Sequence, residues 1–66
     1  MKNRVRELRK SRKWTQEKFG DLLEVSRQTI NSIENGRYDP SLTLALKIAQ
    51  ILEDSVENIF VLSDAE

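Results

Sequence analysis

The stretch from residue 16 to residue 36, QEKFGDLLEVSRQTINSIENG, decides the fold because two short helical patterns meet in it. The first pattern has the spacing of one buried helix face, at Phe19, Leu22 and Leu23. The second has two apolar positions three residues apart, Ile30 and Ile33, and is polar elsewhere. The connection between them is so short that it predicts a tight turn between two angled helices.

Start and stop signals divide the rest of the chain into further helices. A first, highly charged helix is expected from a cap at Asn3 to about Lys13, and Asn35-Gly36 predicts a left-handed stop after the second helix of the central stretch. The apolar run from Leu42 to Leu52 predicts the most buried helix, and a brief helix follows it. The expected caps are Thr15, Ser26 and Ser55, and the start signals before the apolar run are Asp39, Pro40 and Ser41. Strand signals are confined to residues 60–62, so the prediction is an all-α fold with room for one short C-terminal strand.

Length and composition limit the classes of function. The 66 residues suffice for one small domain, over residues 1–66, with a marginal core. The chain has no cysteine and no histidine, so disulfides, thiol nucleophiles and cysteine-based metal sites are excluded and the commonest general base is missing. We therefore expect no enzyme, no metal site and no cofactor. The N-terminal residues contain no long apolar run, so we also expect a soluble cytoplasmic protein with no membrane partner.

Charge is segregated along the chain although the formal net charge is zero. Residues 1–20 carry eight Lys and Arg against two Glu, for a net charge of +6, and residues 41–66 carry a net charge of −4. Such polarity can orient a protein on a phosphate backbone. A solvated basic helix face explains the N-terminal excess about equally well on charge pattern alone.

The polar side of the second central helix carries the chemistry. The surface that its two isoleucines leave free holds Arg27, Gln28, Thr29, Asn31 and Ser32. Side chains of these types read base edges and hold phosphates, so the pattern predicts a helix that enters a groove of DNA. An ordinary hydrated helix face is the alternative, and the flanking sequence decides between them.

The segment from Thr15 to Leu52, TQEKFGDLLEVSRQTINSIENGRYDPSLTLALKIAQIL, resembles the helix-turn-helix family of Cro proteins, phage repressors and xenobiotic-response-element-type regulators. With LRKSRKW before it and SVENIF after it, the resemblance covers almost the whole chain. It implies a five-helix, lambda-repressor-like fold with the motif at residues 16–35 and the recognition helix at residues 27–35. It also implies sequence-specific binding of double-stranded DNA by a homodimer.

The resemblance assigns base reading to the start of the recognition helix. Gln28 ranks first, because a glutamine amide can bond adenine N6 and N7 as a pair. Arg27 can reach a guanine or a phosphate, and the sequence leaves both open. Asn31 and Ser32 lie one turn further on and are the next candidates.

Other positions are expected against the DNA backbone. Gln16 matches the family glutamine at the start of the first motif helix, where exposed amides and its side-chain amide can hold a phosphate oxygen. Thr29 is expected at a phosphate or a thymine methyl, with Ser26 beside it at the helix start. In the following loop, Asn35 and Arg37 are the expected phosphate donors.

The resemblance also implies an ion pair between Arg9 and Glu34, which would tie the first helix to the end of the recognition helix. Three positions depart from the family pattern. Glu24 stands where the turn usually has glycine, so positive φ would strain it, and Gly20 stands where alanine is usual. Trp14 replaces an aliphatic residue and is expected to fill the core.

Dimerisation is expected through the C-terminal third, because one domain covers only half of a site. The apolar residues in excess of what a small core needs are Leu44, Ile51, Phe60, Val61 and Leu62. A terminal strand at residues 60–62 could pair across a two-fold axis.

Several functions are compatible with this pattern. The leading prediction is a repressor that binds an inverted repeat, and with no second domain it has no visible sensor for a small molecule. A restriction-system controller or an antitoxin-type regulator would use the same DNA surface plus a protein contact. A protein-interaction module that has kept the fold without base readout is a third reading, and an enzyme is the weakest because its carboxylates are scattered.

Overall fold

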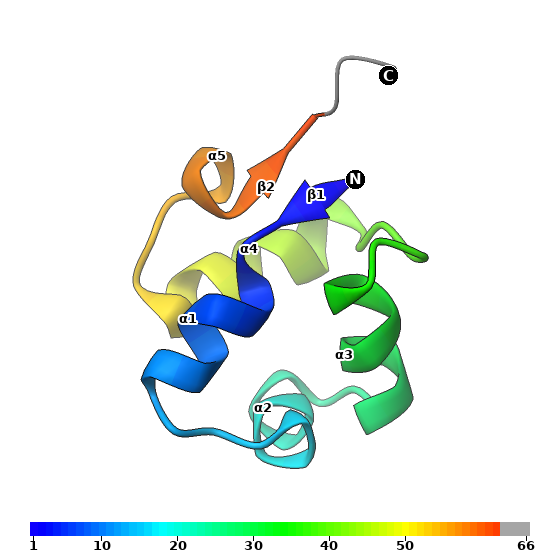
Figure 1. The fold of residues 1–66 in the computed structure, drawn as a ribbon, viewed down its shortest axis with the longest axis vertical. Coiled ribbons are helices and arrows are strands. Elements are labelled where there is room, and N and C mark those ends of the chain that lie inside the picture. The colour runs from blue at the N-terminus through cyan, green and yellow to red at the C-terminus, as the bar shows by residue number, and fades with distance from the viewer. Residues whose placement is uncertain (63–66) are drawn as a thin grey trace.

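The computed structural model describes residues 1–62 and contains five helices and two short strands (Figure 1). The all-α prediction with five helices and a short C-terminal strand is confirmed. The helices are α1 (Val5–Ser11), α2 (Gln16–Leu23), α3 (Arg27–Glu34), α4 (Leu42–Leu52) and α5 (Val56–Ile59). The strands are β1 (Lys2–Asn3) and β2 (Phe60–Val61). No helix within residues 1–62 is long and apolar enough to cross a membrane.

Three helices begin at the serine or threonine cap that the sequence predicts, and α4 begins after Ser41, one of the three start signals before the apolar run. Each cap hydroxyl accepts a hydrogen bond from the backbone N–H three residues later, which satisfies a donor that the first helical turn leaves open. The caps are Thr15, Ser26, Ser41 and Ser55, with donor–acceptor distances of 2.9 to 3.2 Å. Local sequence therefore sets where α2 to α5 begin.

The first helix departs from the prediction at both ends. Its N-cap is Arg4 and makes no side-chain cap bond, although Asn3 Oδ1 accepts from the Val5 N–H at 3.1 Å. The helix ends at Ser11, two residues before Lys13, whose φ is 60°. Asn3 is part of β1 instead of being the cap, so the helix starts one residue later.

The N-terminal strand was not predicted. It pairs antiparallel with β2, with Lys2 opposite Val61 and Asn3 opposite Phe60, and the Arg4 N–H donates to Ile59 O at 2.8 Å. The edge of β2 that faces β1 is therefore not available for the expected pairing across a two-fold axis. Within residues 1–62, β2 pairs with β1 of the same protomer, and the two strands lie side by side (Figure 1).

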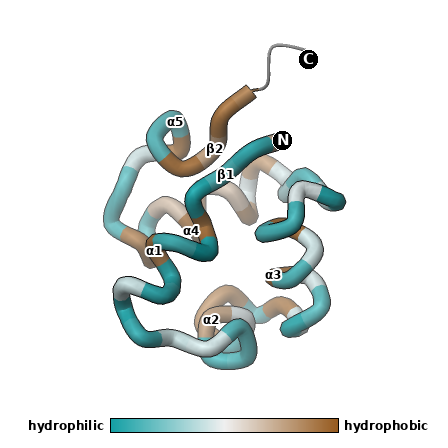
Figure 2. The backbone as a smooth tube through the Cα atoms, in the orientation of Figure 1, coloured by the Kyte–Doolittle hydropathy of each residue, from teal (hydrophilic) through white to brown (hydrophobic). Residues whose placement is uncertain are grey.

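The core gathers apolar side chains from every helix. Figure 2 colours the backbone by hydropathy, with the apolar residues in brown. The largest fully buried side chains are Val5, Phe19, Ile30, Ile33, Ile48, Leu52 and Ile59. Trp14 is half-buried at the edge of this cluster, where its ring stacks on Phe19 at 5.9 Å between centroids. Leu22, expected on the buried face of α2, is 40% exposed because Phe19 and Leu23 already fill that face.

The turn between α2 and α3 is strained at Glu24, whose φ of 60° lies in the left-handed region that favours glycine. The Val25 N–H donates to Gly20 O at 2.9 Å, so the chain reverses directly over α2. A Cβ atom on Gly20 would lie 2.7 Å from Val25 O. The close approach therefore requires glycine at this position in this turn.

Candidate nucleic-acid interface

The tight turn brings the start of α2 beside the polar side of α3. Arg27, Gln28 and Asn31 are exposed and Ser32 is half-buried. These four side chains and Gln16 line one open hollow on the surface. The four residues expected to read bases thus lie together, and a residue from the preceding helix completes the group.

A second shallow hollow adjoins the first. It is lined by Ser26, Gln28, Thr29, Ser32 and Tyr38. The Thr29 hydroxyl oxygen lies 3.0 Å from that of Ser26, so both hydroxyls are engaged at the start of α3. The Tyr38 side chain is 48% exposed here. Its place beside Thr29 and Gln28 adds an amphipathic ring to the recognition surface.

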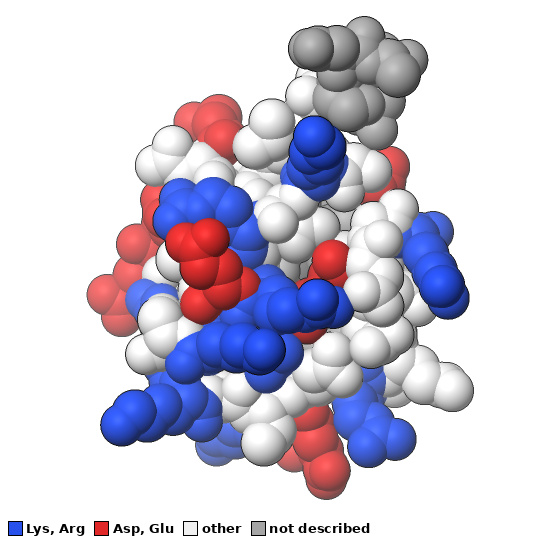
Figure 3. Space-filling model, in the orientation of Figure 1, with Lys and Arg blue, Asp and Glu red and all other residues white. Residues whose placement is uncertain are grey.

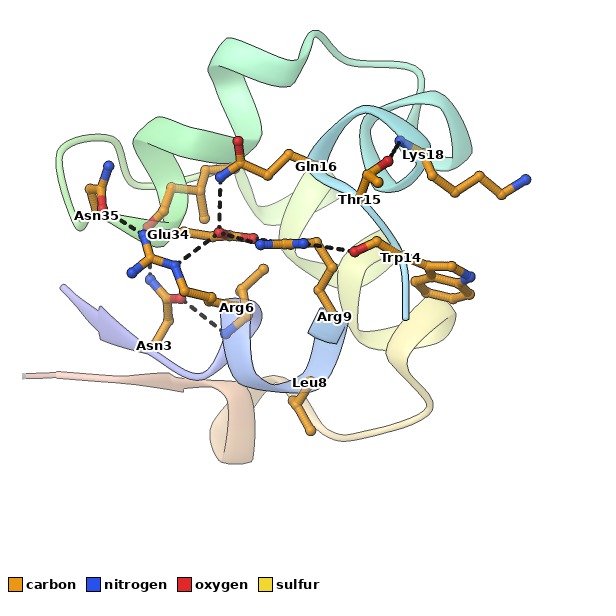
Figure 4. A network of polar contacts seen from close by, with 12 residues as sticks. Asn3, Arg6, Leu8, Arg9, Trp14, Thr15, Gln16, Lys18, Glu34 and Asn35 are labelled. Atoms are coloured by element: carbon orange, nitrogen blue, oxygen red, sulfur yellow. Dashed lines mark hydrogen bonds and ion pairs between the residues drawn. The ribbon is translucent and has the colours of Figure 1, made fainter. Parts of the chain in front are cut away.

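The recognition helix is anchored from behind by apolar and ionic contacts. Ile30 and Ile33 are fully buried on its inner side. At the last residue of α3, Glu34 Oε2 accepts a hydrogen bond from Arg9 Nε at 2.7 Å (Figure 4). The Glu34 side chain is 0% exposed and the Arg9 side chain 8%. Arg9 also donates to Trp14 O at 2.7 Å. The ion pair therefore joins the end of α3 to α1, and Arg9 also holds the backbone at Trp14, just before α2.

Two more donors converge on the same carboxylate. Arg6 Nε lies 3.3 Å and Gln16 Nε2 3.1 Å from Glu34 Oε1. Burial alone would raise the pKa of Glu34, but the hydrogen bonds from Arg9, Gln16 and Arg6 outweigh burial and hold that pKa below its ordinary value. Glu34 is thus a buried anion whose two oxygens both accept hydrogen bonds.

The Gln16 side chain is engaged inside the protein by one end of its amide. Its amide nitrogen faces Glu34 and its oxygen is turned away (Figure 4). A carboxylate can only accept hydrogen bonds, so Glu34 engages the nitrogen of the Gln16 amide. This is the same amide that the sequence predicts to hold a phosphate. Gln16 consequently presents an acceptor oxygen toward the hollow that it shares with Gln28.

The loop after α3 lies beside this surface. Gly36 has φ 74°, as the predicted left-handed stop requires, and the Arg37 N–H donates to Ser32 O at 2.9 Å. The Arg37 side chain is exposed and makes no ion pair within residues 1–62. Asn35 is engaged by Arg6 Nη2, 2.8 Å from its Oδ1, and donates through Nδ2 to Asn31 Oδ1 at 3.1 Å. Arg6 was not singled out from the sequence, where it is one of many N-terminal cations.

Basic side chains gather over α1 on the face that Figure 3 presents, with the red carboxylates between them. Arg4 pairs with Glu7 at 2.8 Å, and Arg6 pairs with Glu34. Part of the N-terminal positive charge is therefore neutralised by ion pairs within the chain. The exposed cations of this region include Lys10, Lys13 and Lys18. The charge segregation seen in the sequence therefore survives folding as a basic face beside α2.

The residues expected at a dimer interface divide into two groups. Phe60 is 8% exposed and Leu44 and Ile51 are half-buried, so these three belong to or border the core of their own protomer. Val61 and Leu62 are 47% and 73% exposed. Two exposed leucines one turn apart on α4 were missed, Leu42 at 73% and Leu46 at 51%. An apolar hollow nearby is lined by Met1, Pro40, Ala45, Val56, Glu57, Phe60, Val61 and Leu62.

Two capped helices joined by a tight turn, with the polar side of the second exposed, define a helix-turn-helix DNA-binding domain. The helix-turn-helix family model matches residues 5–54. An uncharacterised HTH-type transcriptional regulator of Methanocaldococcus jannaschii is 48% identical over 66 residues, which is 100% of each chain. Another from Bacillus subtilis is 47% identical over 64 residues, or 97% of each chain.

A solved structure agrees with these relatives. The restriction-modification controller protein C.AhdI from Aeromonas hydrophila superimposes with a TM-score of 0.76 at 32% identity, over 86% of this chain and 83% of that one. The chain belongs to the Cro/C1-type helix-turn-helix family of transcriptional regulators. It is therefore a DNA-binding protein and not an enzyme.

Proposed function

We propose that this protein is a transcriptional repressor of the cytoplasm that binds an inverted-repeat operator as a homodimer, with α3 in the major groove. The observation that carries the proposal is the single hollow shared by Gln16, Arg27, Gln28, Asn31 and Ser32. Recognition helices of this class place their first residues against base edges. The domain at residues 1–66, with its motif at residues 16–35, would cover one half-site.

Base reading is assigned to the exposed part of α3. Gln28, second in the helix and in both hollows, offers an amide that can pair with adenine N6 and N7. Arg27 lies beside it and makes no ion pair within residues 1–62, and its guanidinium suits guanine O6 and N7 or a phosphate. Asn31 and Ser32 follow on the same side of the helix.

Backbone contacts are assigned to the rim of the surface. Thr29 and Ser26 lie at the start of α3, and Asn35 and Arg37 lie in the loop after it. Contacts of this kind set the register of a protein on DNA without reading its sequence. Each neutralised phosphate adds about 0.9 to the log–log slope of affinity against salt.

Selection of binding sites from randomised duplexes tests the DNA-binding half of the proposal. The expected product is one inverted repeat whose half-sites lie about 34 Å apart on one face of the duplex. A pool that stays random after selection would contradict base reading. A single, unrepeated half-site would contradict binding as a symmetric dimer.

The homodimer is proposed to form through the exposed apolar residues at the end that carries β2. Val61 and Leu62 adjoin an apolar hollow, and Leu42 and Leu46 add exposed surface on α4. A small domain leaves such large side chains in water at a cost of about 25 cal/mol per Å² of apolar area. A second copy of the chain that covers them would remove this cost on both subunits.

Light scattering on matched variants tests the dimer. Val61→Glu introduces a charge into the proposed interface at a side chain that is 47% exposed. Leu22→Glu is the control, since Leu22 is 40% exposed on α2, at the opposite end of the molecule from β2 (Figure 1). We expect a dimer for wild type and Leu22→Glu and a monomer for Val61→Glu. A wild-type mass that stays monomeric at high concentration would contradict the proposal.

The structural match with a restriction-modification controller favours one second candidate. In that role the chain would use the same surface of α3 to regulate a neighbouring gene pair, or would act as an antitoxin-type regulator with a protein partner. The genes on either side of its own gene separate this candidate from a free-standing repressor. A module that binds protein alone would yield no enriched duplex and lose no binding on Gln28→Ala.

A further inference from the structure

The recognition surface contains a short relay of hydrogen bonds whose direction is set by charge. Arg6 Nη2 lies 2.8 Å from Asn35 Oδ1, and Asn35 Nδ2 lies 3.1 Å from Asn31 Oδ1. The relay begins at Arg6 on α1 and passes through Asn35, the C-cap of α3. It ends at Asn31, which lines the same hollow as Gln28. Figure 4 shows its first link, with the Asn35 oxygen facing Arg6.

The chemistry of arginine fixes the orientation of both amides. A guanidinium has N–H donors and no acceptor, so the Asn35 group that faces Arg6 must be the oxygen. The Asn35 nitrogen then faces Asn31, and a nitrogen that donates requires the Asn31 oxygen as its acceptor. Asparagine orientations often have to be chosen between two similar fits, but here the cation at one end leaves a single consistent choice.

The cation itself is held in place by a buried anion. Arg6 Nε lies 3.3 Å from Glu34 Oε1, and the Glu34 side chain is 0% exposed and also bonded to Arg9 and Gln16. Arg6 is half-exposed and long, so without this partner its guanidinium would sample many positions. Glu34 therefore keeps the start of the relay beside Asn35.

We propose that Arg6 and Asn35 are positioning residues that make Asn31 a hydrogen-bond donor toward DNA, so that Asn31 selects a base edge rich in acceptors. The inference rests on the proposed base reading by α3. With its oxygen held by Asn35, the Asn31 amide presents two N–H groups to the hollow. The paired contact with adenine, which needs one donor and one acceptor on the protein, is then disfavoured.

The favoured base follows from the groups displayed in the major groove. Guanine displays two acceptors, N7 and O6, thymine displays the acceptor O4, and cytosine displays only a donor. Asn31 is therefore assigned to guanine first and thymine second. Free asparagine would instead prefer adenine, so Arg6 and Asn35 change the specificity through the orientation of the Asn31 amide.

Two substitutions reverse the polarity at the end of the relay. In Asn35→Asp the new carboxylate still accepts from Arg6 but can only accept from Asn31, so the Asn31 amide turns its nitrogen inward and its oxygen toward DNA. In Asn31→Asp the side chain presents acceptors directly and needs no relay. Asn35→Ala is the control, because it removes the relay without adding charge and leaves the Asn31 amide free to rotate. Asn31 and Asn35 are both exposed, so these variants are expected to fold.

The experiment starts from the selected wild-type operator. Loss of discrimination on Asn31→Ala identifies the base pair that Asn31 contacts, and four duplexes with each base at that position are then compared. Wild type is expected to prefer guanine over cytosine by about tenfold, the range of one well-placed base contact. Asn35→Asp and Asn31→Asp are expected to prefer a base with a donor, adenine or cytosine, and Asn35→Ala to rank guanine and adenine nearly equal.

The rank order of the bases decides the outcome, because an added carboxylate lowers affinity for every duplex alike. An unchanged order in both aspartate variants would overturn the inference while leaving Gln28 and the operator intact. An Asn31→Ala variant that loses discrimination nowhere would overturn it too. Failure to select any operator with wild type would remove the proposed function and this inference together.

Discussion

Arg9 on α1 and Glu34 at the end of α3 form a two-point ion pair inside the protein, with Nε–Oε2 and Nη2–Oε1 distances of 2.7 and 3.2 Å. Their side chains are 8% and 0% exposed. Arg6 and Gln16 also donate to Oε1, so both carboxylate oxygens accept hydrogen bonds. The position of α3 relative to α1 and to the start of α2 is thus held by one buried carboxylate.

Glu34→Ala is expected to lower the free energy of unfolding by about 3–5 kcal/mol, because Arg9 would remain buried without its partner. For a domain of this size that corresponds to a fall in Tm of more than about 10 °C. Thermal unfolding followed by circular dichroism measures it. Glu7→Ala, which breaks the exposed pair with Arg4, is the control and should change Tm little. Equal shifts for the two variants would show that the Glu34 pair behaves as a surface pair.

Stability is expected to fall in acid through Glu34. Its pKa is lower in the folded protein than the ordinary value of 4.5, because the bonds from Arg9, Gln16 and Arg6 outweigh the opposing effect of burial. The stabilisation is therefore complete above that ordinary value and is lost as the pH falls through the pKa of the folded state. The urea midpoints of wild type and Glu34→Gln should differ most near about pH 7, and the difference should shrink as the pH falls through the folded-state pKa of Glu34, which lies below 4.5. A gap that does not change with pH would contradict this.

Gly20→Ala is expected to destabilise the protein although alanine favours a helix by about 1 kcal/mol. The added methyl group would lie 2.7 Å from Val25 O and would push the turn away from α2. Crowding of this kind costs about 1–3 kcal/mol in packed interiors. Gln50→Ala, at an exposed position of α4, is the control and should be near neutral. A more stable Gly20→Ala protein would mean that the turn moves freely.

Glu24→Gly is expected to stabilise the protein by up to about 1 kcal/mol. The φ of 60° at Glu24 costs a residue with a side chain about 1–2 kcal/mol, and glycine removes this cost. Glycine also raises the conformational entropy of the unfolded chain, which offsets part of the stabilisation. Asp21→Gly serves for comparison, because Asp21 lies within α2 and glycine there should cost about 1 kcal/mol. Chemical denaturation of both variants measures the contrast. Two variants destabilised alike would show that Glu24 bears no strain.

Most of the fold could be predicted because its signals are local. The helices α2 to α5 each begin at a Ser or Thr whose hydroxyl caps the first turn, and the bounds of α2 and α4 match the sequence pattern. The strand β1 could not be predicted, because Lys2 and Asn3 have no alternating pattern and pair with residues from the other end of the chain. That pairing also withdraws Asn3 from the start of α1.

The candidate site was predictable in its position and less so in its chemistry. The family pattern places Gln28 and Asn31 on one side of α3, and the structure brings them into one hollow. The orientations of the Gln16 and Asn31 amides depend on Glu34 and Arg6, which approach from distant parts of the chain. The exposed leucines of α4 were missed because the helix is apolar on most sides, so periodicity alone does not separate Leu42 and Leu46 from the half-buried Leu44.

The central claim is that Gln28 reads a base from the start of α3. The most direct measurement is the affinity of wild type and Gln28→Ala for the selected operator and for an unrelated duplex at equal salt, with Gln50→Ala as the matched amide control on α4. We expect Gln28→Ala to lose about 1–3 kcal/mol of discrimination per half-site while its binding to the unrelated duplex is unchanged. Equal discrimination by wild type and Gln28→Ala would contradict the claim.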